Sequence, residues 1–206
     1  AQAIGASLRV ARIRHMPHKR CLIRYEATVG DKQYAFYGKV YTNAKRLRRS
    51  YRATRILHAN PTTSGLVPEP LDYGRDWLFF LMEALPGVQL SAILGREGVE
   101  LSEQSEAVSL TARLLASIHT VEMRAAGSAD LRSDLTKFSR LTKRIPAGHD
   151  EIASAIKETM DALLEFAGTQ EPVATYHTLV HGDFNSRQVL IHEGNARVVD
   201  FDSAGP

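Results

Sequence analysis

The sequence predicts an α+β fold in two lobes, an N-terminal antiparallel sheet with one helix followed by a mainly helical lobe. Apolar and polar residues alternate in the opening segments, as they do in strands. After the Pro-Gly pair at 86–87 the composition changes from strand-like to helical, and two short apolar segments close the chain. We place the boundary near Glu83 to Gly87. This gives an N-terminal lobe of residues 1–85, a C-terminal lobe of residues 86–206 and a cleft between them.

The strands of the N-terminal lobe are expected to form an antiparallel meander. The first three are expected at Leu8 to Arg14, Arg20 to Val29 and Gln33 to Tyr41. A turn-like segment containing a proline makes the first link, and Gly30-Asp31 makes the second link a tight turn. Two further strands are expected at Leu71 to Tyr73 and Trp77 to Met82, around another glycine-containing turn.

One helix lies between these groups of strands. Asn43 to Ala59 is expected to be helical because Leu47 and Tyr51 share one apolar face. The other face is strongly basic and carries Lys45, Arg46, Arg48, Arg49, Arg52 and Arg55. Such a cluster can neutralise nucleic-acid phosphates, but its exposed side offers no aromatic residue for base stacking. We therefore favour a solvated face and expect no nucleic-acid partner.

Two long helices are expected in the C-terminal lobe. Ser102 to His119 is the first, with Ser102 as its N-cap. Asp150 to Ala167 is the second, with Asp150 as N-cap and Gly168 as its stop. Its expected buried stripe comprises Ile152, Ile156, Met160 and Leu163. Between these helices, apolar residues recur at helical spacing at Leu131, Leu135, Phe138 and Leu141. The closing strands are expected at Gln188 to His192 and Arg197 to Phe201.

The composition is that of a globular protein. Of the 206 residues, 44% are hydrophobic and 24% charged, which excludes a largely disordered or low-complexity chain. The net charge of +3 suits an anionic ligand. Cys21 is the only cysteine, so no intrachain disulfide forms, and a reducing compartment is favoured. No apolar run approaches the roughly 20 residues that span a bilayer, so we expect a soluble, cytoplasmic protein without a membrane partner.

The strongest chemical signal is His181-Gly182-Asp183, then Gln188, then Asp200-Phe201-Asp202. Phosphoryl transfer needs a group that orients the attacking hydroxyl and accepts its proton, and oxygen ligands that hold magnesium on the phosphates. Asp183 suits the first task. Gln188 and Asp200 suit the second, because magnesium prefers hard oxygen donors. A loop before one strand and a carboxylate after its hairpin partner would bring the three together at one edge of the cleft.

Residues Tyr176 to Pro206 resemble the catalytic loop of the aminoglycoside phosphotransferase family, which is related to choline kinases and eukaryotic protein kinases. The resemblance implies a protein-kinase-like fold that uses ATP and Mg²⁺. It makes Asp183 the catalytic residue, His181 the residue that braces its loop, and Asp200 a magnesium ligand. Gln188 stands where the family has asparagine, so its amide oxygen lies one methylene further from the backbone.

The resemblance extends to the nucleotide-binding lobe. Lys39 lies where the family places the lysine for the α- and β-phosphates, but the helix Asn43 to Ala59 holds no acidic residue to pair with it. Either another carboxylate serves, or Lys39 is positioned differently. Phe80 to Gly87 resembles the hinge between lobes, where the adenine edge would meet backbone groups near Glu83 and Leu85.

The loop that would cover the phosphates has no glycine-rich run. His18, Lys19 and Arg20 stand at this hairpin tip, and they either grip phosphate by charge or are solvated. The sequence leaves both interpretations open.

The favoured function is ATP- and Mg²⁺-dependent transfer of the γ-phosphate to a hydroxyl of a small aminoglycoside-, choline- or sugar-like acceptor. The main alternative is a non-catalytic, pseudokinase-like regulatory module that binds nucleotide, suggested by Gln188 and the missing acidic partner of Lys39. A basic nucleic-acid-binding protein comes third. A metal hydrolase would need more histidines at ligand spacing than the sequence offers. Because Pro206 follows the metal motif directly, we expect a truncated chain that lacks the helices shaping the acceptor pocket.

Overall fold

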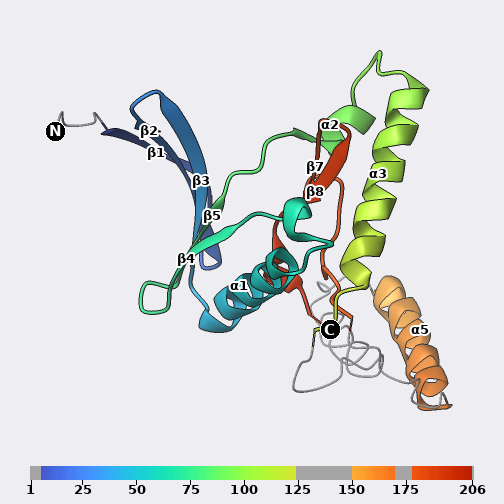
Figure 1. Ribbon diagram of the computed structural model, residues 1–206. Coiled ribbons are helices and arrows are strands. Elements are labelled where there is room, and N and C mark those ends of the chain that lie inside the picture. Colours follow the sequence, from blue (N-terminus) through green and yellow to red (C-terminus); the bar gives the residue numbers. More distant parts are fainter. Residues whose placement is uncertain (1–5, 124–149, 170–177, 206) are drawn as a thin grey trace. The chain divides into compact units, whose positions relative to one another are not determined.

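The computed structural model describes residues 6–123, 150–169 and 178–205 (Figure 1). These residues belong to two compact units. The first comprises Ala1–Met123 with Thr178–Gly205, and the second comprises Arg124–His177 with Pro206. Both groups of residues that carry the chemical signal, around Lys39 and around Asp183, belong to the first unit. The division into lobes at residue 85 stays a prediction.

A five-stranded antiparallel sheet opens the first unit (Figure 1). Its strands are β1 (Ala6–Met16), β2 (Arg20–Val29), β3 (Lys32–Tyr41), β4 (Pro70–Gly74) and β5 (Phe79–Glu83). Their order across the sheet is β1-β2-β3-β5-β4, so the predicted meander is confirmed. One boundary is wrong: β5 begins at Phe79, and Trp77 lies in the preceding turn with 82% of its surface exposed.

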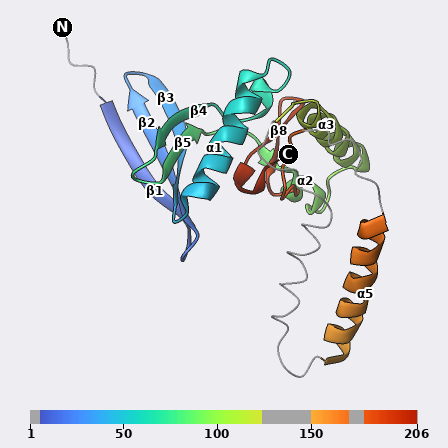
Figure 2. The same ribbon diagram turned by 90° about the horizontal axis from the view of Figure 1, so that it is seen from below.

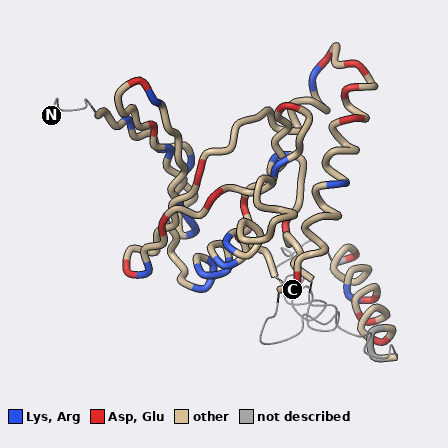
Figure 3. Tube along the Cα trace, in the orientation of Figure 1, with Lys and Arg blue, Asp and Glu red and all other residues tan. Residues whose placement is uncertain are grey.

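Helix α1 (Ala44–Ala59) connects two apolar cores of the first unit. Asn43 caps it, because its side chain accepts a 2.8 Å hydrogen bond from the backbone N–H of Lys45. The helix lies along one face of the sheet (Figure 2), where Leu47 packs with Phe80. Nearly three turns further along the helix, Leu57 joins a second core with residues from the rest of the unit. The lysine and arginine residues of α1 are all exposed, as predicted. Figure 3 shows where Lys and Arg lie along this helix.

The remainder of the first unit surrounds this second core. It comprises the 3₁₀ turn η1 (Ser64–Leu66), β6 (Val88–Gln89), α2 (Leu90–Leu94), α3 (Leu101–His119), β7 (Val189–His192), β8 (Asn195–Val198) and the 3₁₀ turn η2 (Phe201–Ser203). The last three strands form one sheet in the order β6-β7-β8. Large apolar side chains that are fully buried here include Ile118, Leu179, Val189, Val198 and Phe201.

Two predicted boundaries in this part are wrong. Helix α3 begins at Leu101, with Glu100 as its N-cap in place of Ser102, because the extended Glu100 already accepts the first helical bond, from Gln104, at 3.1 Å. Strand β8 ends at Val198 and does not reach Phe201, because Asp200 takes a left-handed backbone conformation with φ of 74° that cannot continue a strand.

The described part of the second unit is helix α5 (Asp150–Thr169). It continues through Gly168, so the predicted stop there is wrong. Asp150 is its first helical residue. Met160 is buried as expected, but Ile152 and Leu163 are 55% and 42% exposed, so the predicted stripe is wrong at these two positions. Leu131, Leu135, Phe138 and Leu141 lie outside the described residues. Within the described ranges, no helix has the length and apolar character needed to cross a membrane.

Candidate active site

The loop that carries Asp183 is held tightly against the end of the chain. Val180 and Gly205 exchange two backbone hydrogen bonds, of 2.7 and 3.0 Å. Gly182 has a φ of 79°, and a β-carbon there would overlap the carbonyl oxygen of Ser203. Only glycine allows both this conformation and this approach. The loop therefore passes directly over the turn η2 that follows Asp200.

His181 braces the same loop from inside. It is 2% exposed, and its Nε2 donates a 3.0 Å hydrogen bond to the backbone oxygen of Val199. Its ring contacts those of Phe184 and Phe201. Burial lowers the pKa of His181, so the neutral ring is favoured. This is the geometry expected of a positioning residue, which holds the loop but does not line the cleft.

Asp183 and Gln188 meet at the start of β7. Gln188 is 7% exposed, and its Nε2 donates a 3.3 Å hydrogen bond to Oδ2 of Asp183. The Asp183 side chain is otherwise exposed to the cleft. The other polar atom of the amide, Oε1 of Gln188, is buried without a hydrogen-bond partner. Since buried oxygens are rarely left unpaired, this atom retains its capacity to accept one further partner.

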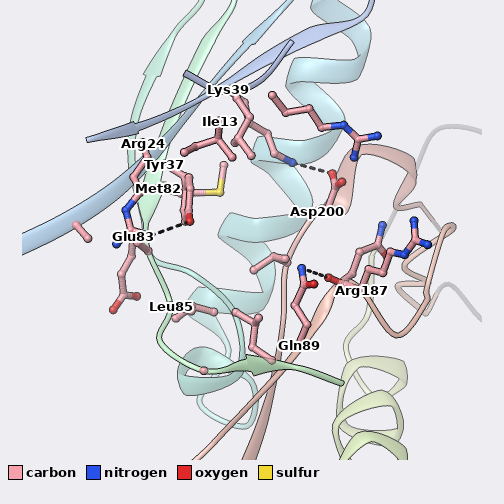
Figure 4. Close-up of a pocket in the computed structure, with 18 of the residues that line it drawn as sticks. Ile13, Arg24, Tyr37, Lys39, Met82, Glu83, Leu85, Gln89, Arg187 and Asp200 are labelled. Atoms are coloured by element: carbon pink, nitrogen blue, oxygen red, sulfur yellow. Dashed lines mark hydrogen bonds and ion pairs between the residues drawn. The ribbon is translucent and has the colours of Figure 1, made fainter. Parts of the chain in front are cut away.

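Two basic residues of the sheet, Lys39 and Arg20, contact two carboxylates near the end of the chain, and Figure 4 shows the contact between Lys39 and Asp200. Lys39 Nζ lies 2.7 Å from Oδ1 of Asp200 and 3.0 Å from Oδ1 of Asp202. The Arg20 guanidinium donates to both oxygens of Asp200, each at 2.8 Å, and also to Asp202. The hydroxyl of Tyr41 donates a 2.7 Å bond to Oδ1 of Asp202. The carboxylate partners of Lys39 therefore follow β8, and none of them comes from α1.

The charges in this network stabilise one another. Burial acts to raise the pKa of Asp200, but Lys39 and Arg20 overcome it and hold that pKa well below its ordinary value. Burial acts to lower the pKa of Arg20, and the hydrogen bonds to Asp200 raise it on balance. Burial and the charge of Asp202 raise the pKa of Tyr41. The tyrosine therefore stays protonated and donates to Asp202 at any ordinary pH.

A cleft of about 1160 Å³ joins these groups to the hinge. The sequence-predicted residues that line it are Lys39, Glu83, Leu85, Asp183, Gln188 and Asp200, whereas His181 is not among its lining residues. Figure 4 shows Glu83 and Leu85 at one end of the cleft and the contact between Lys39 and Asp200 at the other. The N–H of Glu83 donates to Glu69, and that of Ala84 donates to Ala35. Leu85 lines the cleft, and its N–H donates to no backbone oxygen among the described residues.

Sequence reasoning assigned no role to Tyr41 or Asp202 and left Arg20 open. The predicted pairing of the strands could have indicated Tyr41 and Arg20. Lys39 and Tyr41 are two residues apart on β3, so their side chains share a face, and Arg20 stands opposite Tyr41 on β2. For Asp202 the only signal was its place in the Asp-Phe-Asp motif.

A model of the phosphotransferase enzyme family matches residues 24–206. The chain belongs to this family. The predicted resemblance is thereby confirmed, and so is phosphotransferase character at the level of the family. Comparison with curated proteins finds no match.

Solved structures of similar fold include two aminoglycoside phosphotransferases and an ethanolamine kinase. A thermostable variant of aminoglycoside phosphotransferase APH(4)-Ia with ADP and hygromycin B has a TM-score of 0.70 and 16% identity, over 96% of this chain and 67% of that one. APH(2")-IIa with streptomycin and ATP has a TM-score of 0.61 and 13% identity, over 98% and 67%. A Plasmodium vivax ethanolamine kinase has a TM-score of 0.60 and 15% identity, over 97% and 57%. These likenesses confirm the predicted protein-kinase-like fold.

Proposed function

We propose that this protein transfers the γ-phosphate of ATP to a hydroxyl group of a small molecule in a magnesium-dependent reaction. The observation that carries the proposal is one cleft lined by both the Asp183–Gln188 pair and the Lys39–Asp200 pair. Two solved structures of similar fold support it, one with ADP and hygromycin B and one with ATP and streptomycin. We infer an acceptor of aminoglycoside-, choline- or sugar-like character.

Different residues along the cleft would bind the adenine, the phosphates and the acceptor. The N–H of Leu85 and the backbone at Glu83 would hold the adenine edge. Lys39, fixed by Asp202, would bind the phosphates. The exposed carboxylate of Asp183 would orient the acceptor hydroxyl and take its proton. The amide of Gln188 keeps that carboxylate in place through its 3.3 Å hydrogen bond.

The residues around Asp200 fit a magnesium ion in their donor chemistry. Oε1 of Gln188 is a buried oxygen without a partner, and the low pKa of Asp200 keeps its carboxylate ionised. Among the described residues, no group of three or more His, Cys, Asp or Glu side chains is arranged to hold a metal. Two protein oxygens therefore suit magnesium, which also takes waters and phosphate oxygens as ligands. When bound, the ion would neutralise charge on the transferred phosphate.

The regulatory alternative rested on two departures from the family pattern. One was the absence of an acidic partner for Lys39 on α1, but Asp200 and Asp202 both contact Lys39. Only the replacement of asparagine by Gln188 still favours it. We therefore keep the enzyme as the proposed function.

An acceptor screen tests the proposal. We expect release of ADP from Mg-ATP when the protein is supplied with hygromycin B, streptomycin, choline, ethanolamine or hexoses, with at least one of these phosphorylated. ATP binding measured by calorimetry should be stronger with Mg²⁺ than with EDTA. Magnesium-dependent binding without phosphorylation of any acceptor in a broad panel would favour the regulatory alternative, and the absence of such binding would contradict the nucleotide site.

A further inference from the structure

The strongest unexplained contact in the cleft is that of Arg20 with Asp200. The guanidinium spans both carboxylate oxygens at 2.8 Å, the two-pronged geometry that makes arginine–carboxylate pairs strong. Asp200 is also the carboxylate that the proposed function assigns to magnesium. A cation at Asp200 needs at least one of these two oxygens. Arg20 and the cation therefore compete for the same atoms.

Arg20 is also within reach of whatever Lys39 binds. Both side chains donate to the same oxygen, Oδ1 of Asp200, Arg20 at 2.8 Å and Lys39 at 2.7 Å. Both line the cleft. A phosphate oxygen that reaches Lys39 is thus near a second cation, and the arginine fork suits phosphate as well as it suits carboxylate.

The second carboxylate provides a fixed point for Arg20. Asp202 is 8% exposed, does not line the cleft, and is held by Lys39 and Tyr41. Arg20 also donates to Asp202, through the same nitrogen that contacts Asp200. The backbone of Arg20 is also held in place. Arg20 begins β2 directly after a turn in which the carbonyl oxygens of His18 and Lys19 accept hydrogen bonds from the Thr42 hydroxyl. The guanidinium can therefore leave Asp200 without leaving the site.

The charge balance favours such an exchange. Arg20 and Lys39 supply two positive charges, and Asp200 and Asp202 supply two negative charges. A divalent cation bound to Asp200 adds two positive charges, and the phosphates of ATP bring the negative charge that both basic residues then face.

We propose that Arg20 is a phosphate-binding residue that exchanges Asp200 for a phosphate oxygen when Mg-nucleotide binds. The inference rests on the proposed function and assigns one residue of the hairpin tip, which the sequence left open between a phosphate grip and a solvated charge. Arg20 thus limits the affinity of Asp200 for a bare cation and strengthens the binding of the metal–nucleotide complex. These two effects have opposite signs when Arg20 is removed.

The test compares Arg20→Gln with Arg12→Gln, which removes an exposed charge from the same hairpin but does not line the cleft. Binding of Mn²⁺ is measured by electron paramagnetic resonance without nucleotide, and binding of Mg-ATP by calorimetry. For Arg20→Gln we expect Mn²⁺ to bind about tenfold more tightly and Mg-ATP about tenfold more weakly, the scale of one charge-assisted hydrogen bond. Arg12→Gln should change neither affinity by more than about twofold.

A second variant separates the loss of the two-pronged contact from an effect of misfolding. Arg20→Lys keeps the charge but cannot span both oxygens, so it should also bind Mn²⁺ more tightly while losing less of the Mg-ATP affinity. Unchanged or weaker Mn²⁺ binding in both folded variants would overturn the exchange. The proposed function fails separately, if the unmodified protein shows no magnesium-dependent binding of ATP.

Discussion

Tyr41 donates a 2.7 Å hydrogen bond to the same oxygen of Asp202 that lies 3.0 Å from Lys39 Nζ. Asp202 thereby takes the place of the acidic residue that α1 lacks. Its position follows from the packing of α1, which carries Leu47 against the sheet and Leu57 into the same core as Phe201. This packing places Asp202, the residue after Phe201, within hydrogen-bond distance of Lys39.

Replacing Asp202 with asparagine should weaken both stability and nucleotide binding. Removing one partner of a buried ion pair leaves the other charge uncompensated and costs about 3–5 kcal/mol. We expect a loss at the lower end of this range in urea unfolding, because Asp200 still faces Lys39. Asp76→Asn, which changes an exposed carboxylate in the turn before β5, should cost less than about 0.5 kcal/mol. Equal stability of the two variants would show that Asp202 does not anchor Lys39.

A substitution at Gly182 should disturb the loop that carries Asp183. Gly182→Ala meets both a left-handed backbone, at φ 79°, and the carbonyl of Ser203. Gly194→Ala is the matched control, because its φ is 69° but nothing lies near its added carbon. We expect Gly182→Ala to be less stable than the control by about 1–3 kcal/mol, the cost of overpacking. Similar unfolding free energies would mean that the loop can move away from Ser203.

Stability should fall as the pH drops below the ordinary pKa of histidine, about 6.5. Burial lowers the pKa of His181 in the folded chain, and its Nδ1 is buried without a partner for a second proton. The unfolded chain therefore takes up a proton that the folded chain resists, and the free energy of unfolding decreases by at most about 1.4 kcal/mol per pH unit from this residue. Urea titrations between pH 7.5 and 5.5 should show a shallower dependence for His181→Asn than for His15→Gln, an exposed control. Identical slopes in these two variants would remove His181 as the cause.

The sequence was most informative where a pattern is local. Alternation predicted the strands of the first sheet, and the spacing of Leu47 and Tyr51 predicted α1 within one residue. The motif residues Asp183, Gln188 and Asp200 line one cleft, as their spacing suggested. The contact of Lys39 with Asp202 joins residues 163 positions apart, and no local pattern encodes such a pairing. The start of α3 was misplaced for a different reason. Glu100 caps this helix through its backbone, so no characteristic side chain marks the position.

Asp183→Asn separates catalysis from binding. The variant keeps the shape of the side chain but loses the proton acceptor, so turnover should fall by about 10²-fold or more, the range of general-base catalysis. The affinity for Mg-ATP should change little, because Asp183 contacts Gln188 and none of the basic residues of the sheet. Steady-state kinetics with an identified acceptor checks the turnover, and calorimetry with Mg-ATP checks the affinity. Unchanged turnover would refute the catalytic assignment.

Asp200→Asn should produce a different signature, because it removes one of the two carboxylates that balance Arg20 and Lys39. With EDTA present, ATP should bind this variant more tightly than the unmodified protein, since both basic side chains then face the phosphates with less competition. Added Mg²⁺ should strengthen ATP binding in the unmodified protein but have little effect on the variant, whose amide is a weaker ligand than the carboxylate. Turnover should be lost together with the magnesium effect. If Asp200→Asn retained the full enhancement by Mg²⁺, Asp200 would not be a magnesium ligand, and its contacts with Arg20 and Lys39 would be purely structural.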